Sequence, residues 1–167
     1  MTLPAPRVPG TYRILFVCMG NICRSPAGEG VMAKMLQEAG LADRVRVDSA
    51  GTLGYKDGHP ADARICAAAA RRGYTLTSKS RRVQATDLEQ FDLLVAMDRD
   101  HLFHLHAMDP AGVYRDRIKL MLEFSPTPRK ADVPDPYTEG DEAFEHVLDL
   151  IEPACSQLCK LVQAELA

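Results

Sequence analysis

The sequence lacks the features that mark a membrane or secreted protein. No stretch of its 167 residues is long and apolar enough to span a membrane. The first ten residues contain three prolines and no apolar core, so they do not look like a secretory signal. We expect residues 1–10 to be a flexible N-terminal lead-in. We also expect a cytoplasmic protein without a membrane partner.

Charge and cysteine content exclude two further classes. The formal net charge of −3 argues against general nucleic-acid binding, although it allows a local basic pocket. Five cysteines are an odd number, and without a secretory signal they argue against a disulfide framework and for a reducing compartment. Hydrophobic residues make up 46% and charged residues 26%, which is typical of a globular domain. We assign residues 11–167 to a single domain and expect a monomer.

Apolar runs alternate with helical patterns along the chain. We predict strands at residues 13–18, 45–50, 91–97 and 120–124. The pattern predicts a helix that begins with Ser25 as N-cap and ends near Gly40. Further helices are predicted at residues 61–72 and 99–107, with a short helical turn from a capping box at 86–89. The last segment has helical spacing, and Pro153 should kink or split that helix. This order predicts a three-layer, doubly wound α/β fold with a central, mostly parallel four-stranded sheet.

The run from Cys18 to Pro26, CMGNICRSP, carries the strongest chemical signal. It lies between the first predicted strand and the first predicted helix, at the end of the sheet where ligands bind in such folds. Gly20 and Asn21 tolerate unusual backbone angles, which lets successive N–H groups converge on an anion. The start of the helix adds positive potential, and Arg24 can hold two phosphate oxygens. These features favour a thiolate at Cys18 and predict a cysteine nucleophile inside a phosphate cradle.

The spacing of Cys and Arg is weak evidence by itself, because Cys66 and Arg72 share it. The intervening residues are alanine-rich and lack glycine, so they indicate a helix whose amides bond internally. We therefore expect Cys66 to be a buried helix residue and Arg72 to be solvated.

The run Cys18–Pro26 closely resembles the signature of the low-molecular-weight protein tyrosine phosphatases, which reads Cys, any residue, Gly-Asn, any residue, Cys-Arg-Ser-Pro. The similarity continues at residues 48–52, 58–64, 91–98 and 135–137, and so covers nearly the whole chain. It implies an enzyme that hydrolyses phosphotyrosine in a protein substrate through a phosphocysteine intermediate. It also implies that no metal or other cofactor is needed, and that inorganic phosphate is both product and inhibitor.

The resemblance assigns roles to individual residues. Cys18 would be the nucleophile, Arg24 would bind the phosphoryl group, and Asp135 would act as general acid and then as general base. A supporting hydrogen-bond network would comprise Asn21, Ser25 and Ser49. The residues implied to bind phosphate or substrate are Met19, Gly20, Asn21, Ile22, Cys23, Ser25, Tyr55 and Tyr137.

Three of these positions bear on substrate choice. Tyr55 would form an aromatic rim of the pocket, and Tyr137 would pack against the phenyl ring of the substrate. Ile22 and Tyr55 are the candidates for specificity. Thr138 stands where many family members have a second aromatic residue, so one wall of the pocket should be more open.

Three other functions remain as alternatives. A phosphoarginine phosphatase would be expected to have Thr at the position of Ile22, whose bulky apolar side chain suits an aromatic ring. An arsenate reductase would need resolving cysteines near residues 79–97, and this stretch contains none. A phosphoprotein-binding module without activity would be expected to lack the cysteine or the acid.

Two further side-chain groups have their own interpretation. Cys23 lies close to Cys18 in a curved loop, so we predict that oxidation forms a Cys18–Cys23 disulfide that protects the nucleophile. His101, His104 and His106 are clustered without a matching pattern of Cys or carboxylate ligands, so we interpret them as surface or helix-packing residues rather than a metal site.

Overall fold

The computed structural model describes residues 1–167. Its sheet has four strands in the order β2-β1-β3-β4, and all neighbouring pairs are parallel. The strands are β1 (Tyr12–Cys18), β2 (Val45–Gly51), β3 (Leu93–Ala96) and β4 (Ile118–Leu120). The predicted α/β fold is confirmed, and the sheet is wholly rather than mostly parallel. The strand order changes direction beside β1, which places a topological switch point at the carboxyl ends of β1 and β3.

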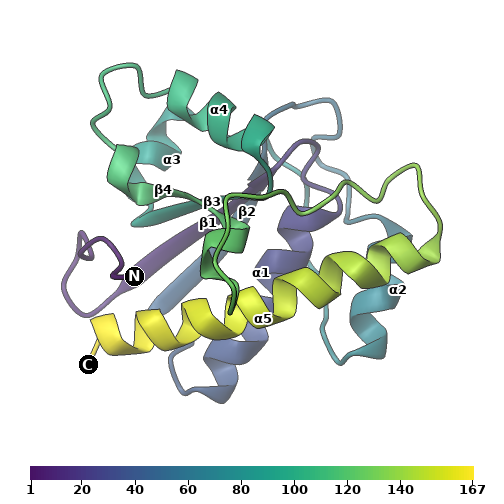
Figure 1. The fold of residues 1–167 in the computed structure, drawn as a ribbon, viewed down its shortest axis with the longest axis horizontal. Coiled ribbons are helices and arrows are strands. Elements are labelled where there is room, and N and C mark those ends of the chain that lie inside the picture. Colours follow the sequence, from purple (N-terminus) through teal and green to yellow (C-terminus); the bar gives the residue numbers. More distant parts are fainter.

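Helices cover both faces of the sheet and complete three layers (Figure 1). One face carries α1 (Arg24–Glu38), α2 (Ala63–Arg71) and the long α5 (Asp141–Glu165). The other carries α3 (Ala85–Gln90) and α4 (Arg99–Ala107). Side chains of β1 alternate between the two cores: Phe16 lies in the larger cluster and Val17 in the smaller one. Burial on both faces explains why this strand is apolar throughout. None of the helices is both long and apolar enough to cross a membrane.

A glycine sets the distance between α1 and the sheet. A Cβ atom at Gly28 would lie 2.8 Å from Met97 Cε and 2.9 Å from Phe16 Cδ1. The helix therefore packs directly on β1 and on the end of β3, at a spacing that a larger residue would disturb. This contact fixes where α1 begins relative to the end of β1.

Several predicted elements differ from those in the structure. The predicted strand at 120–124 is wrong: β4 ends at Leu120, and Met121–Phe124 is a 3₁₀ turn. Glu123 Oε2 accepts the backbone N–H of Leu120 at 2.7 Å, which draws the chain into that turn. The capping box lies two residues before the predicted position, with Asp87 Oδ2 accepting the backbone N–H of Gln84 at 2.7 Å.

Pro153 does not split the last helix, because α5 is assigned without interruption from Asp141 to Glu165 (Figure 1). A proline removes one helical hydrogen bond, but the bonds on both sides remain. One stripe of α5 is buried on both sides of Pro153, from Phe144 to Val162, and packs against α1 and α2. This packing offsets the missing bond.

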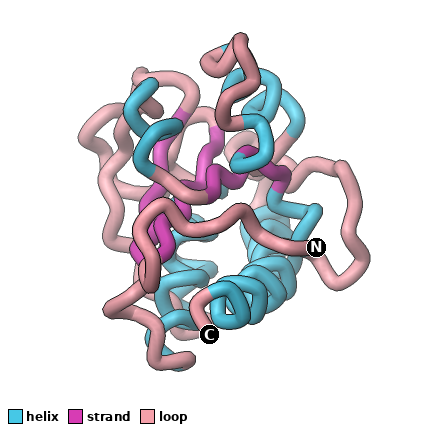
Figure 2. The backbone as a smooth tube through the Cα atoms, turned by 90° about the vertical axis from the view of Figure 1, so that its left-hand side faces the viewer, coloured by secondary structure: helices cyan, strands magenta, loops and turns pink.

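Residues 1–10, which we expected to be a flexible lead-in, make several contacts. Leu3 is buried, the backbone N–H of Arg7 donates to Asp92 Oδ1 at 2.7 Å, and Tyr12 donates to the carbonyl oxygen of Pro4 at 2.9 Å. Figure 2 shows this segment as a loop that leads into the sheet, with both chain ends on the same side of the molecule. The flexibility of the segment stays a prediction, as does the assignment of residues 11–167 as the domain.

We expected Arg72 to be solvated, but it forms ion pairs that link the end of α2 to α5. Its guanidinium contacts Glu145 and Asp149 at 2.9 Å each, and it also pairs with Glu152. These three carboxylates lie along one face of α5, so Arg72 neutralises a row of like charges. Arg71 is more exposed and pairs with Glu145 alone.

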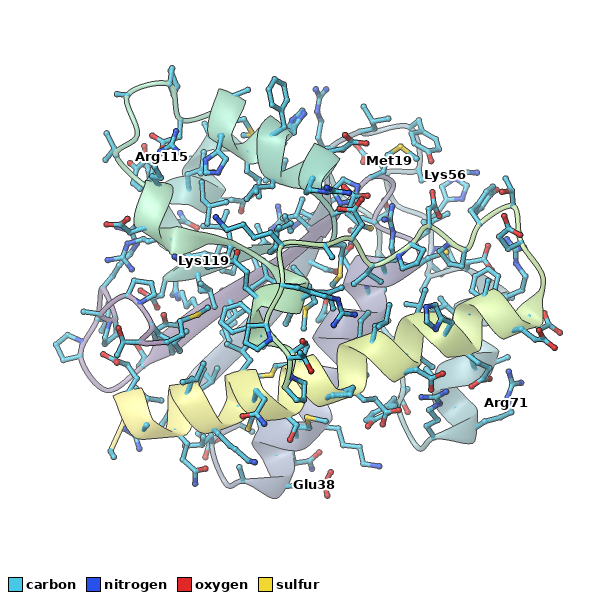
Figure 3. All side chains as sticks on the ribbon, in the orientation of Figure 1. Met19, Glu38, Lys56, Arg71, Arg115 and Lys119 are labelled. Carbon is cyan, nitrogen blue, oxygen red and sulfur yellow. The ribbon has the colours of Figure 1, made fainter.

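Substitution of Arg72 tests this network. We expect Arg72→Met to lower the free energy of unfolding by about 1–2 kcal/mol, because three neighbouring carboxylates lose their shared cation. Arg71→Met, at the outer side of α2 in Figure 3, is the matched control and should change it by less than about 0.5 kcal/mol. Urea titrations should show that the difference shrinks at about 1 M salt, where charges are screened. A loss that is equal for both variants, or independent of salt, would contradict this interpretation.

Candidate active site

The loop between β1 and α1 has an unusual hydrogen-bonding state. None of the backbone N–H groups of residues 19–25 donates a hydrogen bond within the protein. Asn21 has a φ of 56°, in the left-handed region, and this turns the chain sharply. Buried amides are nearly always paired, so a run of free ones indicates a site that is built to receive acceptors from a ligand.

A chain of side-chain hydrogen bonds leads from this loop to Cys18. The backbone N–H of Arg81 donates to Asn21 Oδ1 at 3.0 Å, and Asn21 Nδ2 donates to Ser25 Oγ at 2.8 Å. Ser25 Oγ lies 2.9 Å from Cys18 Sγ. Ser25 accepts from Asn21, and its own hydrogen has two acceptors in reach: the sulfur, which is the nearer one, and the carbonyl oxygen of Ala50 at 3.5 Å. The chain of bonds therefore presents a donor to Cys18.

The start of α1 also differs from the prediction. The helix begins at Arg24 with Cys23 in the N-cap position, so Ser25 is not the cap. The reason is that the hydroxyl of Ser25 is engaged with Asn21 and Cys18 instead. No side chain caps this helix end, and its first N–H groups add to the free amides of the loop.

Two close approaches shape the loop. A Cβ atom at Gly51 would lie 2.6 Å from the carbonyl oxygen of Met19, and a Cβ atom at Gly20 would lie 3.0 Å from the hydroxyl of Tyr55. Ser80 Oγ donates to the carbonyl oxygen of Gly20 at 2.8 Å. These contacts hold the backbone of the loop against its neighbours.

Arg24 is buried and held along one edge. Its Nη1 donates to Asp98 Oδ2 at 2.8 Å and to the carbonyl oxygen of Val133 at 2.9 Å, while Nη2 lies 3.8 Å from Asp135 Oδ2. Nε makes no hydrogen bond, so the edge formed by Nε and Nη2 remains available. This edge has the geometry that binds two oxygens of a phosphate.

One pocket brings most of the predicted site residues together. It is lined by Cys18, Met19, Gly20, Ile22, Cys23, Arg24, Tyr55, Asp135 and Tyr137. Tyr55 and Tyr137 are 58% and 42% exposed and belong to the rim, whereas Ile22 is buried. In Figure 3, Met19 and Lys56, the neighbour of Tyr55, mark this end of the molecule, close to the loop that precedes α5. The side chain of Asp135 is 42% exposed and faces into the pocket mouth near Arg24.

Arg64 supports one wall of the pocket. Its guanidinium makes two hydrogen bonds of 3.0 Å to the carboxylate of Asp62. It also lies over the rings of Tyr137 and Phe144, with 5.3 Å and 4.5 Å to the ring centroids. Because Arg64 belongs to α2 and Phe144 to α5, this stack ties Tyr137 to two helices.

Ser49 is the predicted network residue that the structure does not bring to the loop. Its hydroxyl donates to Glu29 Oε1 at 2.6 Å instead. The pKa of Glu29 is raised, mainly by burial, although the bond from Ser49 opposes that shift. Ser49 thus serves the carboxyl of Glu29 beneath the loop.

Sequence reasoning missed the residues that support the arginine. Asp98 follows β3, which lies beside β1, and the rule that ligands bind at the carboxyl ends of strands could have indicated it. His101 is three residues further on and buried, with Nδ1 3.1 Å from Asp98 Oδ1. The roles of Arg64 and Arg81 carried no signal of their own, since each depends on packing between distant segments.

Burial changes the titration of two groups at the site. It raises the pKa of the Cys23 thiol to about 12, and the negative charge of Asp62 adds to this shift. Burial lowers the pKa of His101 to about 4; Asp98 opposes the shift and Arg24 adds to it. At neutral pH, Cys23 is therefore a thiol and His101 is uncharged.

The shift at His101 predicts how stability depends on pH. An unfolded histidine titrates near 6.5 and the folded one near 4, so the unfolded chain binds more protons between these values. The stabilisation is fully present above about pH 6.5 and is lost as the pH falls. Between pH 7 and pH 4.5 we expect the wild type to lose roughly 2–3 kcal/mol more unfolding free energy than His101→Leu. Parallel urea titrations measure the difference, and identical pH profiles would refute the shift.

Comparison with known proteins places this site in a family. Residues 13–167 match the family model described as low molecular weight phosphotyrosine protein phosphatase. A Streptomyces coelicolor low molecular weight protein-tyrosine-phosphatase is 39% identical over 157 residues, which are 93% of this chain and 96% of the relative.

Solved structures show the same likeness. The crystal structure of an Entamoeba histolytica protein tyrosine phosphatase with Hepes in the active site superposes with a TM-score of 0.88, at 40% identity over 92% of this chain and 98% of that one. Vibrio vulnificus Wzb in complex with benzylphosphonate superposes with a TM-score of 0.78, at 31% identity over 89% and 97% of the two chains. Together with the geometry of the loop at Cys18, these matches show that the chain belongs to the low molecular weight phosphotyrosine protein phosphatase family.

Proposed function

We propose that this protein is a protein tyrosine phosphatase in which Cys18, Arg24 and Asp135 carry the chemistry. The single observation that supports this most directly is the run of free backbone N–H groups at residues 19–25, next to the free edge of Arg24 and the sulfur of Cys18. Together they offer a tetrahedral dianion several donors and one positive charge.

In the first step, the sulfur of Cys18 attacks phosphorus and the bond from phosphorus to the phenolic oxygen breaks. The Nε and Nη2 groups of Arg24 and the loop amides stabilise the charge on the oxygens that do not react. Asp135 donates a proton to the leaving phenolate. Its place at the pocket mouth, 3.8 Å from Arg24 Nη2, suits a group that must reach the leaving oxygen.

In the second step, water attacks the phosphocysteine and the bond between sulfur and phosphorus breaks. Asp135, now a carboxylate, accepts the proton of that water. Cys18 leaves as a thiolate and inorganic phosphate is released. Ser25 supports the sulfur in both steps, because its hydroxyl can donate to the returning negative charge.

The pocket walls support an aryl phosphate as substrate. Ile22 offers an apolar surface, and the rings of Tyr55 and Tyr137 flank the opening. Thr138 follows Tyr137 in place of a second aromatic residue, so we expect one wall of the pocket to be more open. The benzylphosphonate bound to the Vibrio vulnificus relative carries a phenyl ring one atom away from phosphorus, as phosphotyrosine does, and supports an aryl phosphate as the substrate.

Three further properties belong to the same proposal. Inorganic phosphate fits the same donors as the substrate, so we propose that it inhibits as product. We propose a monomer; the nucleophile, the arginine and the acid of the pocket all come from a single chain, so the site needs no second copy. We also propose a reducing compartment such as the cytoplasm, which is supported by the five free cysteines.

The alternatives are not favoured. Phosphoarginine would place a charged guanidinium against Ile22, which offers no hydrogen bond. Arsenate reduction needs thiols that relay a disulfide, but Cys155 and Cys159 are buried in α5 and burial raises the pKa of both thiols. The presence of both Cys18 and Asp135 in one pocket argues against a module that only binds phosphoproteins.

Replacement of Asp135 tests the proposed acid. We expect Asp135→Asn to slow phenyl phosphate hydrolysis by roughly 100-fold to 1,000-fold, because a phenolate leaves poorly without a proton. The leaving group of p-nitrophenyl phosphate is a stable anion that depends less on protonation. The rate loss on this substrate should therefore be smaller than the loss on phenyl phosphate by a factor of about ten or more. Steady-state kcat on both substrates measures this difference.

The control is Asp132→Asn, which removes an exposed carboxylate in the same loop that pairs with Arg99. It should leave the ratio of the two rates unchanged. Equal slowing of both substrates by Asp135→Asn would refute the acid role, and turnover by Cys18→Ser would refute the nucleophile.

We further propose that Cys23 protects Cys18 from irreversible oxidation. Peroxide converts the Cys18 thiolate to a sulfenic acid and releases hydroxide; the sulfur of Cys23 then attacks it, forming the disulfide and releasing water. Both cysteines line the same pocket, which supports the pairing. The raised pKa of Cys23 means that this second reaction should be faster at higher pH.

Peroxide treatment tests this role. We expect wild-type enzyme to regain most of its activity after addition of a thiol reductant, and peptide mapping to show a Cys18–Cys23 bridge. Cys23→Ala should recover little of its own starting activity, whereas Cys66→Ala should behave as wild type. Irreversible loss without a bridge in the wild type would overturn the proposal.

A further inference from the structure

Among the buried side-chain nitrogen and oxygen atoms, one lacks a hydrogen bond: Nδ1 of His101. The residue is 4% exposed and lies in the first turn of α4, next to Asp98, which binds Arg24. Nδ1 is 3.1 Å from Asp98 Oδ1, yet the contact does not meet hydrogen-bond geometry. Such an atom calls for an explanation, because the other buried side-chain nitrogen and oxygen atoms all have a hydrogen-bond partner.

The surroundings of His101 decide which ring nitrogen carries the proton. Asp98 and Asp100 face it from its own helix, Arg24 from α1, and Asp135 from the loop that precedes α5. Without a proton, Nδ1 would place its lone-pair charge 3.1 Å from an oxygen of the Asp98 carboxylate and be repelled. The proton of the neutral ring therefore belongs on Nδ1, where it can be donated to Asp98.

We propose that His101 is a positioning residue for phosphate binding: its Nδ1–H steers the carboxylate of Asp98, and Asp98 in turn holds the guanidinium of Arg24 with its free edge toward the phosphate. The order of contacts supports this. Asp98 Oδ2 accepts from Arg24 Nη1 at 2.8 Å, while Oδ1 accepts the backbone N–H of His101 at 3.0 Å and faces the imidazole. One carboxylate thus links the imidazole to the arginine.

Because Nδ1 of His101 is close to Asp98 without forming a hydrogen bond, we infer that the two residues have a second arrangement in which this bond forms. In the ligand-free site, Asp98 and the carbonyl of Val133 share Arg24 Nη1. A phosphate dianion on the other edge draws the guanidinium toward the pocket, and Asp98 then rotates to accept from Nδ1. Without phosphate, the positive charge of Arg24 helps to lower the pKa of His101. A bound phosphate dianion offsets this charge, so the pKa of His101 should rise when phosphate binds.

Two substitutions separate positioning from packing. His101→Leu keeps a similar volume and removes the donor, whereas His101→Asn is smaller but keeps an N–H group near the position of Nδ1. We expect His101→Leu to weaken inhibition by inorganic phosphate about tenfold and to raise KM for p-nitrophenyl phosphate similarly, because a hydrogen bond to a charged group is lost. His101→Asn should stay within about threefold of wild type.

His104→Leu, on the same helix, is the matched control and should leave both constants unchanged. A packing role predicts the reverse order, with the smaller Asn worse than Leu. That order, or phosphate inhibition of His101→Leu within about twofold of wild type, would overturn the inference.

Nitrogen NMR of labelled wild-type protein tests the same idea without any substitution. We expect a neutral His101 with its proton on Nδ1, and a pKa that rises when inorganic phosphate saturates the site. A proton on Nε2, or a pKa that does not respond to phosphate, would refute the link even if the variants fail to fold.

The inference rests on the proposed phosphatase function, and the measurements keep the two apart. A wild type that neither hydrolyses p-nitrophenyl phosphate nor binds phosphate would refute the function. If the wild type does both and His101→Leu has the same phosphate inhibition and KM as the wild type, only the role of His101 is refuted.

Discussion

A buried backbone N–H group without an acceptor in the protein destabilises the fold by about 1–3 kcal/mol when it also loses its water. The loop at residues 19–25 carries a row of such groups. It keeps this conformation because its other atoms are tied down: Asn21 is held from both sides by Arg81 and Ser25, and Ser80 holds the carbonyl of Gly20. The strand before the loop and the helix after it, which are both packed in the core, fix its two ends. A phosphate would satisfy the whole row at once, so the conformation of the loop favours anion binding.

The positive charge at the site depends on a second restraint of the same kind. Arg24 is buried, and a buried guanidinium is tolerable only with partners. Asp98 and the carbonyl of Val133 take one edge and leave the other free. Because Val133 belongs to the loop that carries Asp135, and its N–H donates to the carbonyl of Met97, the arginine, the acid loop and the end of β3 form one unit. A change at any of them should alter phosphate binding through the others.

The parts that could be predicted from the sequence are those governed by local pattern. The apolar run of β1, the glycine and asparagine of the loop and the periodicity of the helices follow from rules that act within a few residues, and the family signature adds Asp135 and the tyrosines. The errors arose where distant contacts decide. In an isolated helix Ser25 would be the N-cap, but here its hydroxyl contacts Asn21 and Cys18 instead. Arg72 would be solvated on a lone helix, but α5 brings three carboxylates to it. Pro153 would split a lone helix, but the buried stripe of α5 keeps the helix continuous; a kink at Pro153 stays a prediction.

Asp98 and His101 belong to the same class, and they show why a site can be only half visible in a sequence. Cys18 and Arg24 share one loop, so their spacing can be read. Asp98 lies 74 residues after Arg24, just beyond β3, and it comes close to Arg24 only because β3 pairs with β1. Its function is set by topology: the carboxyl ends of adjacent parallel strands meet, and the anion cradle on one strand receives its counter-charge from the next. His101 is one turn further into α4, so its burial behind that carboxylate follows from the same pairing. The sheet order therefore determines the electrostatics of the arginine as much as the nine-residue loop does.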